Sequence, residues 1–177
     1  MLHWLRQLIK PEYEPLNRVE IIRGHIINNF NYLQAQQPGK QLWPVLKSNA
    51  YGHGLKEVCQ ILNDTAAKTV VVDSFPEAQI AYRYFRGRVL ILGEMPLAAY
   101  RYADFSRTDF CVYNIETFKY LAKNHRHSRI HLFINTGMNR EGIANLPEFW
   151  QAVASDLKNL KIVGLASHLA AAETESG

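Results

Sequence analysis

The sequence predicts an α/β fold built around a parallel β-sheet. Six short apolar runs, rich in β-branched residues, alternate with amphipathic stretches, which is typical of βαβ units. The runs are continuously apolar, which indicates strands covered on both faces, as parallel strands are. The composition, 47% hydrophobic and 20% charged, is that of a folded domain and excludes a disordered, collagen-like or coiled-coil chain.

The apolar runs are the predicted strands. In chain order they occupy residues 42–47, 69–73, 89–93, 109–113, 130–135 and 162–168. Pro44 cannot donate a hydrogen bond within a central ladder, so the pairing of the first strand is expected to begin at or after this residue.

The amphipathic segments between the runs are predicted helices. Residues 23–36 place Ile26, Phe30 and Leu33 on one stripe, and residues 55–66 have a similar apolar stripe. Further helices are predicted at residues 75–86, 97–103, 115–124 and 146–158.

The residues alone leave two architectures open. Six strand–helix units fit a (β/α)8 barrel, which usually has about 250 residues, with two units missing. A doubly wound open sheet of six strands would be complete at this length, but it should carry a glycine-rich phosphate turn after its first strand. The chain has Tyr51-Gly52-His53-Gly54 there, and GxGxxG is absent. Gly52 and Gly54 are predicted to permit a sharp turn between strand and helix.

Charge and composition narrow the function classes. The balance of 20 Lys+Arg against 16 Asp+Glu is not clustered, and the densest basic group, residues 123–129, lacks interleaved aromatics, so we expect no nucleic-acid partner. No apolar run reaches the roughly 18 residues of a membrane span, and polar residues break residues 1–10, so we expect no membrane segment and no signal peptide. Cys59 and Cys111 lie in apolar segments, so we expect both thiols to be buried. Free, buried cysteines fit a protein of the reducing cytoplasm.

Lys47 is the candidate chemical group of the first strand. It closes an apolar run, so it would lie at the carboxyl end of a strand, where barrel enzymes keep their working groups. An amine partly desolvated by Trp43, Val45 and Leu46 would be nucleophilic toward an aldehyde. On residue type alone, a lysine that ends a strand and points to water is the commoner case.

The surroundings of Lys47 resemble a known family. The run at residues 44–54 (PVLKSNAYGHG) closely resembles the pyridoxal-phosphate lysine segment of the alanine racemases, a fold-type III barrel family. Three further segments resemble that family in the same order: residues 74–78 (SFPEA), residues 135–143 (NTGMNREGI), and Ser167-His168 with residues 170–173. The resemblance extends over residues 17–173. It implies that residues 1–177 are the N-terminal part of a pyridoxal-phosphate-binding (β/α)8 TIM-type barrel, truncated to about six β/α units, without the family's C-terminal β domain.

The resemblance also implies roles for individual residues. Lys47 would form the internal aldimine with pyridoxal phosphate and then act as one of two acid–base groups at the substrate Cα. Tyr51 would bind the cofactor phosphate, and His168 would lie beside the pyridine ring. Arg140 would hydrogen-bond the phenolic oxygen of the cofactor and, with Met138, contact the substrate. Open alternatives are a packed aromatic for Tyr51, a structural role for Met138 and a barrel histidine without a ligand for His168. No metal site is implied.

The chain departs from the family pattern in several places. The family commonly has a lysine, often carbamylated, at the position of Phe133, so the anion that braces Arg140 must come from elsewhere, a bound anion or another side chain. The family tryptophan near residues 18–20 is absent. The second acid–base group, a tyrosine of the partner's C-terminal domain, and the last two barrel strands are also absent. We therefore expect a fragment that does not racemise alanine alone.

The function implied is that of a cytoplasmic amino-acid racemase. Alanine racemase, which interconverts L- and D-alanine for cell-wall peptidoglycan and is a homodimer at full length, is the first choice. A broad-specificity, serine or lysine racemase remains open, because the substrate pocket depends on absent residues. A non-catalytic pyridoxal-phosphate carrier barrel is a further alternative, although its lysine segment does not normally read NAYGHG. An inert partial barrel would bind nothing.

Overall fold

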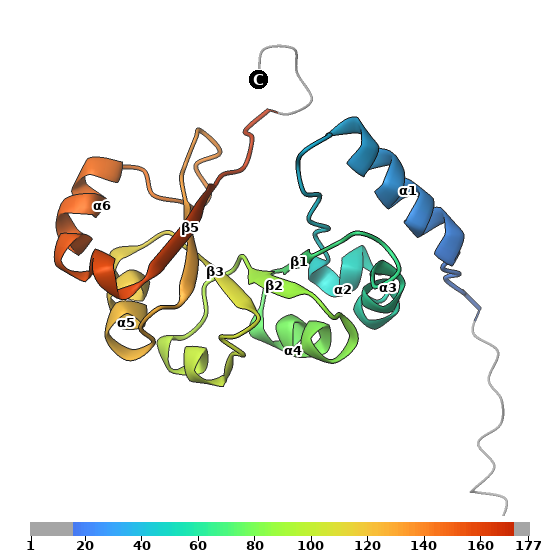
Figure 1. Ribbon diagram of the computed structural model, residues 1–177, viewed down its shortest axis with the longest axis horizontal. Helices are drawn as coiled ribbons and strands as arrows, with labels where there is room; N and C mark the ends of the chain where they lie inside the picture. The colour runs from blue at the N-terminus through green and yellow to red at the C-terminus, as the bar shows by residue number, and fades with distance from the viewer. Residues whose placement is uncertain (1–15, 172–177) are drawn as a thin grey trace, which may run out of the picture.

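The computed structural model describes residues 16–171, which form a curved sheet of five parallel strands (Figure 1). The strands lie side by side in chain order: β1 (Thr69–Val72), β2 (Arg88–Ile91), β3 (Thr108–Val112), β4 (Arg129–Phe133) and β5 (Lys161–Ala166). Two predictions fall on residues outside this range. They are the absence of a signal peptide at residues 1–10 and the family resemblance of residues 172–173.

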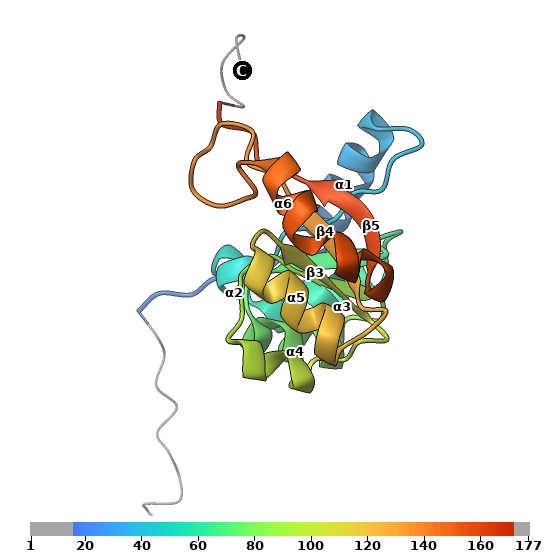
Figure 2. The same cartoon turned by 90° about the vertical axis from the view of Figure 1, so that its left-hand side faces the viewer.

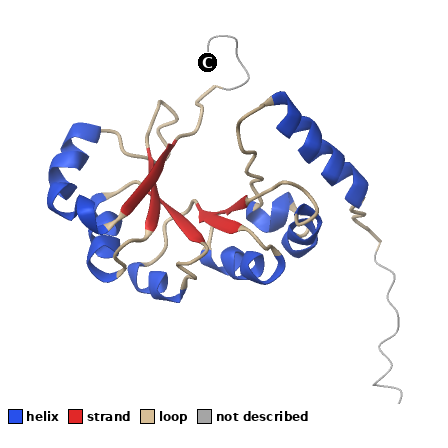
Figure 3. Ribbon diagram, in the orientation of Figure 1, coloured by secondary structure: helices blue, strands red, loops and turns tan. Residues whose placement is uncertain are grey.

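The helices cover the convex side of the sheet (Figures 1 and 3). Figure 2 views this outer side, with α5 and α6 in front of the strands. The α-helices are α1 (Arg23–Gln36), α2 (Lys47–Tyr51), α3 (Leu55–Leu62), α4 (Phe75–Tyr84), α5 (Ile115–Asn124) and α6 (Leu146–Val153), and two 3-10 helices are η2 (Leu97–Tyr102) and η3 (Ala154–Asn159). Within residues 16–171, no helix has the length and apolar character that a membrane crossing requires.

Both faces of the sheet carry apolar cores, because successive strand residues point to opposite sides. The larger core lies between strands and helices and includes Val70, Val72 and Phe118, all fully buried. A smaller inner core lines the concave side; its buried members are Val71, Leu90, Cys111 and Phe133. The prediction of parallel strands buried on both faces is confirmed for β1 to β4, as is the burial of both cysteines. It is wrong for β5, where Leu165 is 67% exposed.

This arrangement is that of a partial (β/α)8 barrel. The strands follow one another in sequence order and the sheet curves continuously, whereas a doubly wound sheet reverses its strand order and has helices on both faces. Here the concave side is lined by side chains of the strands themselves. The barrel alternative is therefore the correct one.

The first predicted strand, residues 42–47, was wrong in extent. It reduces to one parallel bridge, Val45 with Val71, in which Leu46 N donates to Val71 O at 2.7 Å and Val71 N donates to Pro44 O at 2.9 Å. Pairing begins at Pro44, within the expected limit, but it does not continue into a regular strand. A proline without an N–H limits the ladder on this side.

The helices also differ in places from the predicted ones. Residues 97–103 form a 3-10 helix rather than an α-helix, and the segment at 146–158 changes from α to 3-10 after Val153. The helix predicted to reach residue 66 ends at Leu62, because the Asn63 side chain bonds the backbone of Tyr84 and Arg86 instead.

The amphipathic stripe of α1 is only partly buried. Phe30 is buried, whereas Leu33 remains 51% exposed. The main packing partner of α1 is α3, since α1 lies beside the edge of the sheet.

Candidate functional site

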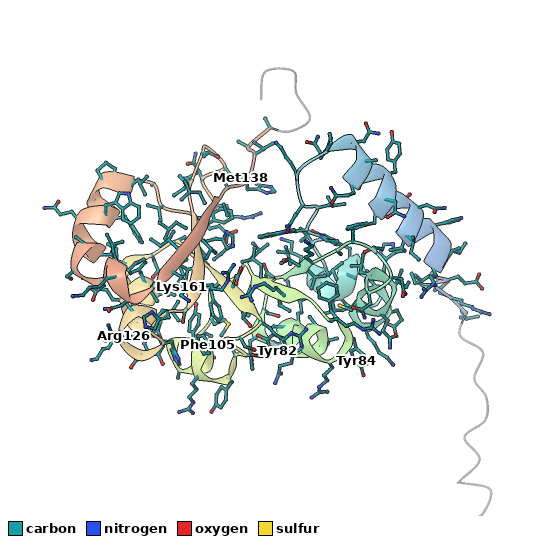
Figure 4. All side chains as sticks on the ribbon, viewed as in Figure 1. Tyr82, Tyr84, Phe105, Arg126, Met138 and Lys161 are labelled. Atoms are coloured by element: carbon teal, nitrogen blue, oxygen red, sulfur yellow. The ribbon has the colours of Figure 1, made fainter. Side chains whose placement is uncertain are left out.

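The five predicted site residues follow strand ends at one end of the sheet. All strands are parallel, so their carboxyl ends meet on the same side. Lys47 and Tyr51 follow the bridged segment beside β1, Met138 and Arg140 lie on the loop after β4, and His168 follows β5. Figure 4 shows Met138 at this end, far from Lys161, the first residue of β5.

The backbone after Lys47 forms a left-handed turn. Ser48, Asn49, Ala50 and Tyr51 have φ values between 53° and 55°, and the first three have ψ values between 46° and 50°. The left-handed region costs a residue with a Cβ atom about 1–2 kcal/mol. Four such residues in succession persist only where the surrounding structure holds them.

Hydrogen bonds on both sides hold this turn. Ala50, which is buried, donates its N–H to Leu46 O at 2.8 Å, and Gly54 donates to Asn49 O at 3.0 Å. The side-chain Oδ1 of Asn49 accepts the N–H of Leu55, the first residue of α3, at 2.8 Å. Gly52 and Gly54 have φ values of 88° and 91°, so their predicted use as permissive turn residues is confirmed.

Glu77 joins the turn to the end of β1. Its Oε1 accepts the N–H of Ser48 at 2.7 Å, and its Oε2 accepts the N–H of Asp73 at 2.9 Å. Ser74 and Glu77 have the spacing of a helix capping box, yet the Ser74 side chain makes no capping bond. Glu77 is not among the predicted site residues, although its spacing from Ser74 is a signal that its carboxylate accepts backbone N–H groups.

An Asn side chain shapes the loop after β4. The Oδ1 atom of Asn135 accepts the N–H groups of Gly137 at 3.0 Å and of Asn139 at 3.1 Å. Its Nδ2 atom donates to the Asn139 side chain at 3.0 Å. This loop carries both Met138 and Arg140, so Asn135 fixes the backbone that presents them.

Two hydroxyl groups tie this loop to the end of β5. The Thr136 and Ser167 hydroxyls share a hydrogen bond of 2.5 Å, and the Ser167 hydroxyl donates to Ile134 O at 2.9 Å. As a result, Met138, Arg140 and His168 line one small pocket, together with Phe133 and Glu141.

Arg140 is paired with Glu141. Its Nη2 atom donates to Glu141 Oε1 at 3.1 Å, and both side chains are partly exposed. Phe133 lies below in the inner core. The acid beside Arg140 is therefore a side chain of its own loop, which no pattern in the sequence had indicated.

The electrostatics of the inner core, which contains Cys111, disfavour a cysteine nucleophile. Burial raises the pKa of the Cys111 thiol to about 12, and the charges of Glu141 and Asp109 add to this effect. Burial also raises the pKa of Tyr113, with Glu94 and Glu141 contributing. Both groups stay protonated near neutral pH.

The five predicted residues lie in two groups. Arg140, Met138 and His168 share the pocket described above, whereas Lys47 and Tyr51 do not line it. Lys47 is half-buried, and its amine has no hydrogen bond or ion pair to any residue between 16 and 171; Tyr51 is 60% exposed. Over the same range, no group of three or more His, Cys, Asp and Glu side chains is arranged to hold a metal ion.

Comparisons with known proteins converge on one family. A family model described as alanine racemase, N-terminal domain, matches residues 21–176. Alanine racemase from Lactobacillus acidophilus is 30% identical over 173 residues, covering 93% of this chain and 46% of that protein. The chain thus spans about half the length of the curated relatives it matches.

Solved structures share the fold. Alanine racemase from Bacillus anthracis with bound L-Ala-P has a TM-score of 0.79 and 25% identity, covering 92% of this chain and 45% of that one. Alanine racemase from Bartonella henselae with covalently bound pyridoxal phosphate has a TM-score of 0.77 and 20% identity, covering 88% and 46%.

Proposed function

The chain belongs to the alanine racemase family, matching its N-terminal domain, and on this premise we propose that it forms the cofactor-binding barrel portion of an isomerase that interconverts L- and D-alanine with pyridoxal phosphate. Because the chain spans about half of each relative, the activity is proposed for the complete enzyme and not for this chain alone.

The observation that carries this proposal is the left-handed turn after Lys47. Its four residues adopt a costly conformation, and Asn49, Gly52 and Glu77 hold them in it. Strain of this kind is found where a structure presents a group for binding or catalysis. The group presented is the Lys47 amine, which has no partner within residues 16–171.

The residues at this end of the sheet fit the cofactor. An amine can bond the aldehyde covalently, a phenol hydroxyl can donate to the phosphate, and a guanidinium can donate to the phenolic oxygen. When bound, pyridoxal phosphate supplies a conjugated ring that spreads the negative charge left when a proton leaves Cα. With the cofactor and substrate bound, the Lys47 amine would move that proton on one face of Cα.

The remaining residues bind and orient. Tyr51 hydrogen-bonds the cofactor phosphate, and His168 lies beside the ring. Arg140 holds negative charge at the phenolic oxygen and contacts the substrate with Met138. Glu141 keeps the Arg140 guanidinium in place through their 3.1 Å contact, which is the bracing that Phe133 cannot provide.

The proposal extends to partners and location. The substrate is alanine, and the enzyme works as a homodimer in which the partner supplies the second acid–base group. Its place is the cytoplasm, where it supplies D-alanine for peptidoglycan. A finer choice among small amino acids depends on residues outside this chain.

An absorbance titration with pyridoxal phosphate tests the proposal. The chain should develop a long-wavelength band that disappears on borohydride reduction, and the peptide carrying Lys47 should retain the cofactor mass. Lys47→Ala should lose both signals, and Lys119→Ala, a matched control at an exposed residue of α5, should keep them. Equal labelling of the two variants would contradict the proposal.

A second measurement separates a racemase from a carrier. In the complete enzyme, the Cα proton of each alanine enantiomer should exchange with solvent, with inversion, and Lys47→Ala should abolish exchange. Cofactor binding without exchange would favour a carrier barrel, and faster exchange with serine or lysine would change the substrate.

A further inference from the structure

A separate cavity lies at the amino-terminal end of the sheet, opposite Lys47. Its volume is about 450 Å³, and strand-start residues form much of its wall. Arg88 and Arg129 are the first residues of β2 and β4, Asp109 is the second residue of β3, and His131 is the third of β4. Lys68 precedes β1 and also lines the cavity.

A buried carboxylate anchors this group. Asp109 is 2% exposed, and its Oδ1 atom accepts Arg129 Nε at 2.8 Å and Arg88 Nε at 3.2 Å. Arg88 Nη2 also pairs with Asp109, and Arg88 Nη1 donates to Ser106 O at 3.0 Å. All three nitrogens of the Arg88 guanidinium therefore donate hydrogen bonds within the chain.

Other donors in the cavity have no hydrogen-bond partner within residues 16–171. Arg129 Nη1 and Lys68 Nζ have no hydrogen-bond partner among residues 16–171, and both side chains are at least partly exposed. His131 is 8% exposed, and its Nε2 atom has no hydrogen-bond partner over the same range; Asp109 Oδ2 lies 3.6 Å away, too far for one. A buried polar atom without a partner is costly, so an unpaired Nε2 that lines a cavity points to a ligand there.

The charge of the cavity defines the ligand. Lys68, Arg88 and Arg129 supply three cations against one carboxylate, which Arg88 and Arg129 both contact. The unpaired charge is positive, and its donors are N–H groups suited to oxygen acceptors. A cation would be repelled, and a neutral ligand would leave the surplus charge uncompensated.

We propose that this cavity binds a small, doubly charged oxyanion such as phosphate through Arg129, His131 and Lys68. This site is independent of the proposed function, because it lies at the other end of the sheet from Lys47. Asp109 holds Arg129 from behind while the free Nη1 of Arg129 faces the anion. Trp43 lines the same cavity and contacts the His131 ring edge-on, with centroids 5.6 Å apart, so its fluorescence can report binding.

Phosphate titration at constant ionic strength tests the site. Trp4→Phe and Trp150→Phe remove the other two tryptophans, and the emission of Trp43 should then change saturably with phosphate. Lys68→Gln removes no contact of the fold, and loss of a charged donor should raise the dissociation constant about tenfold. Arg129→Gln should act similarly. Arg126→Gln, an exposed change of equal charge outside the cavity, should leave the constant unchanged.

A thermal shift supplies a second reading, since an anion that binds only the folded chain raises its melting temperature. Phosphate should do so in the wild type and in Lys47→Ala, and less in Lys68→Gln. Three results would overturn the proposal: no saturable change in fluorescence, equal constants for Lys68→Gln and Arg126→Gln, or a phosphate effect that vanishes in Lys47→Ala. The last would assign the anion to the opposite end of the sheet.

Discussion

The two ends of the curved sheet differ in whether their central charged group is paired. At the amino end, the buried Asp109 carboxylate is bonded by two guanidiniums. At the carboxyl end, the Lys47 amine is without a partner within residues 16–171, and the backbone that follows it is left-handed. At the amino end, the pairing of a buried carboxylate with two guanidiniums thus contributes stability, whereas at the carboxyl end a costly backbone conformation presents the Lys47 amine. Mutations at the two ends should therefore separate stability from binding.

The largest expected effect is at Asp109. Asp109→Asn leaves two guanidiniums without their carboxylate, and breaking such a buried pair should lower the free energy of unfolding by about 3 kcal/mol. The control is Asp64→Asn, which breaks the exposed pair with Arg23 and should cost less than about 1 kcal/mol. Urea denaturation measures both. Equal losses would show that the amino end has no special role in stability.

The same cluster predicts a pH dependence. Burial by itself would raise the pKa of Asp109, but contacts with His131, Arg129 and Arg88 outweigh burial and hold the pKa well below its usual range. A depressed folded-state pKa gives stability that is fully present above the unfolded value of about 3.9 and is lost as the pH falls toward the folded value.

Denaturation at a series of pH values measures this loss. The difference in unfolding free energy between the wild type and Asp109→Asn should be constant near neutral pH and shrink below about pH 4. A difference that stays constant in acid would show that the carboxylate is not stabilised in the folded chain.

An intermediate effect is expected at Glu77, which belongs to the carboxyl end. In Glu77→Gln, the amide oxygen can accept only one of the two N–H groups of Ser48 and Asp73, so one charge-assisted hydrogen bond is lost, at a cost of about 1–2 kcal/mol. Because the turn loosens, pyridoxal phosphate should also bind more weakly in the absorbance titration. Glu116→Gln, at an exposed helix start, is the control. If Glu77→Gln loses stability but binds pyridoxal phosphate with unchanged affinity, the turn does not contribute to cofactor binding.

The sequence predicted these two ends unequally. The positions of β1 to β5 followed from apolar runs, because these are local patterns, whereas the strand that Lys47 was predicted to close is only a bridge at Val45. The pairing of Asp109 with Arg88 and Arg129 joins residues about twenty positions apart across strands, so no local pattern carries it. Asp109 was assigned only to the start of an apolar strand. The position of an aspartate at a strand start does not indicate which cationic side chain will pair with it.

At the carboxyl end, the sequence predicted which residues lie there but not their backbone conformation. Gly52 and Gly54 indicated a sharp turn, yet the left-handed residues before them carry side chains that disfavour this conformation. Long-range bonds, such as the one from Ser48 to Glu77, impose it. The pairing of Arg140 with Glu141 was likewise invisible, because adjacent residues of opposite charge seldom indicate a functional contact.

The smallest expected effect concerns Ser48, and it has the opposite sign. Ser48→Gly removes a left-handed penalty of about 1–2 kcal/mol, while the added freedom of glycine in the unfolded chain returns about 0.5–1 kcal/mol. The folded chain should therefore become more stable by about 0.5 kcal/mol, and the less restricted turn should bind pyridoxal phosphate more weakly. Urea denaturation and the absorbance titration measure the two changes.

Ser155→Gly is the matched control for this change. Ser155 lies in the 3-10 helix η3 with a negative φ, so glycine there relieves nothing and should destabilise the chain by about 0.5–1 kcal/mol. Opposite signs for the two serines would demonstrate strain beside Lys47. If both substitutions destabilise the chain equally, the turn is unstrained, and the contrast between the two ends rests on Asp109 alone.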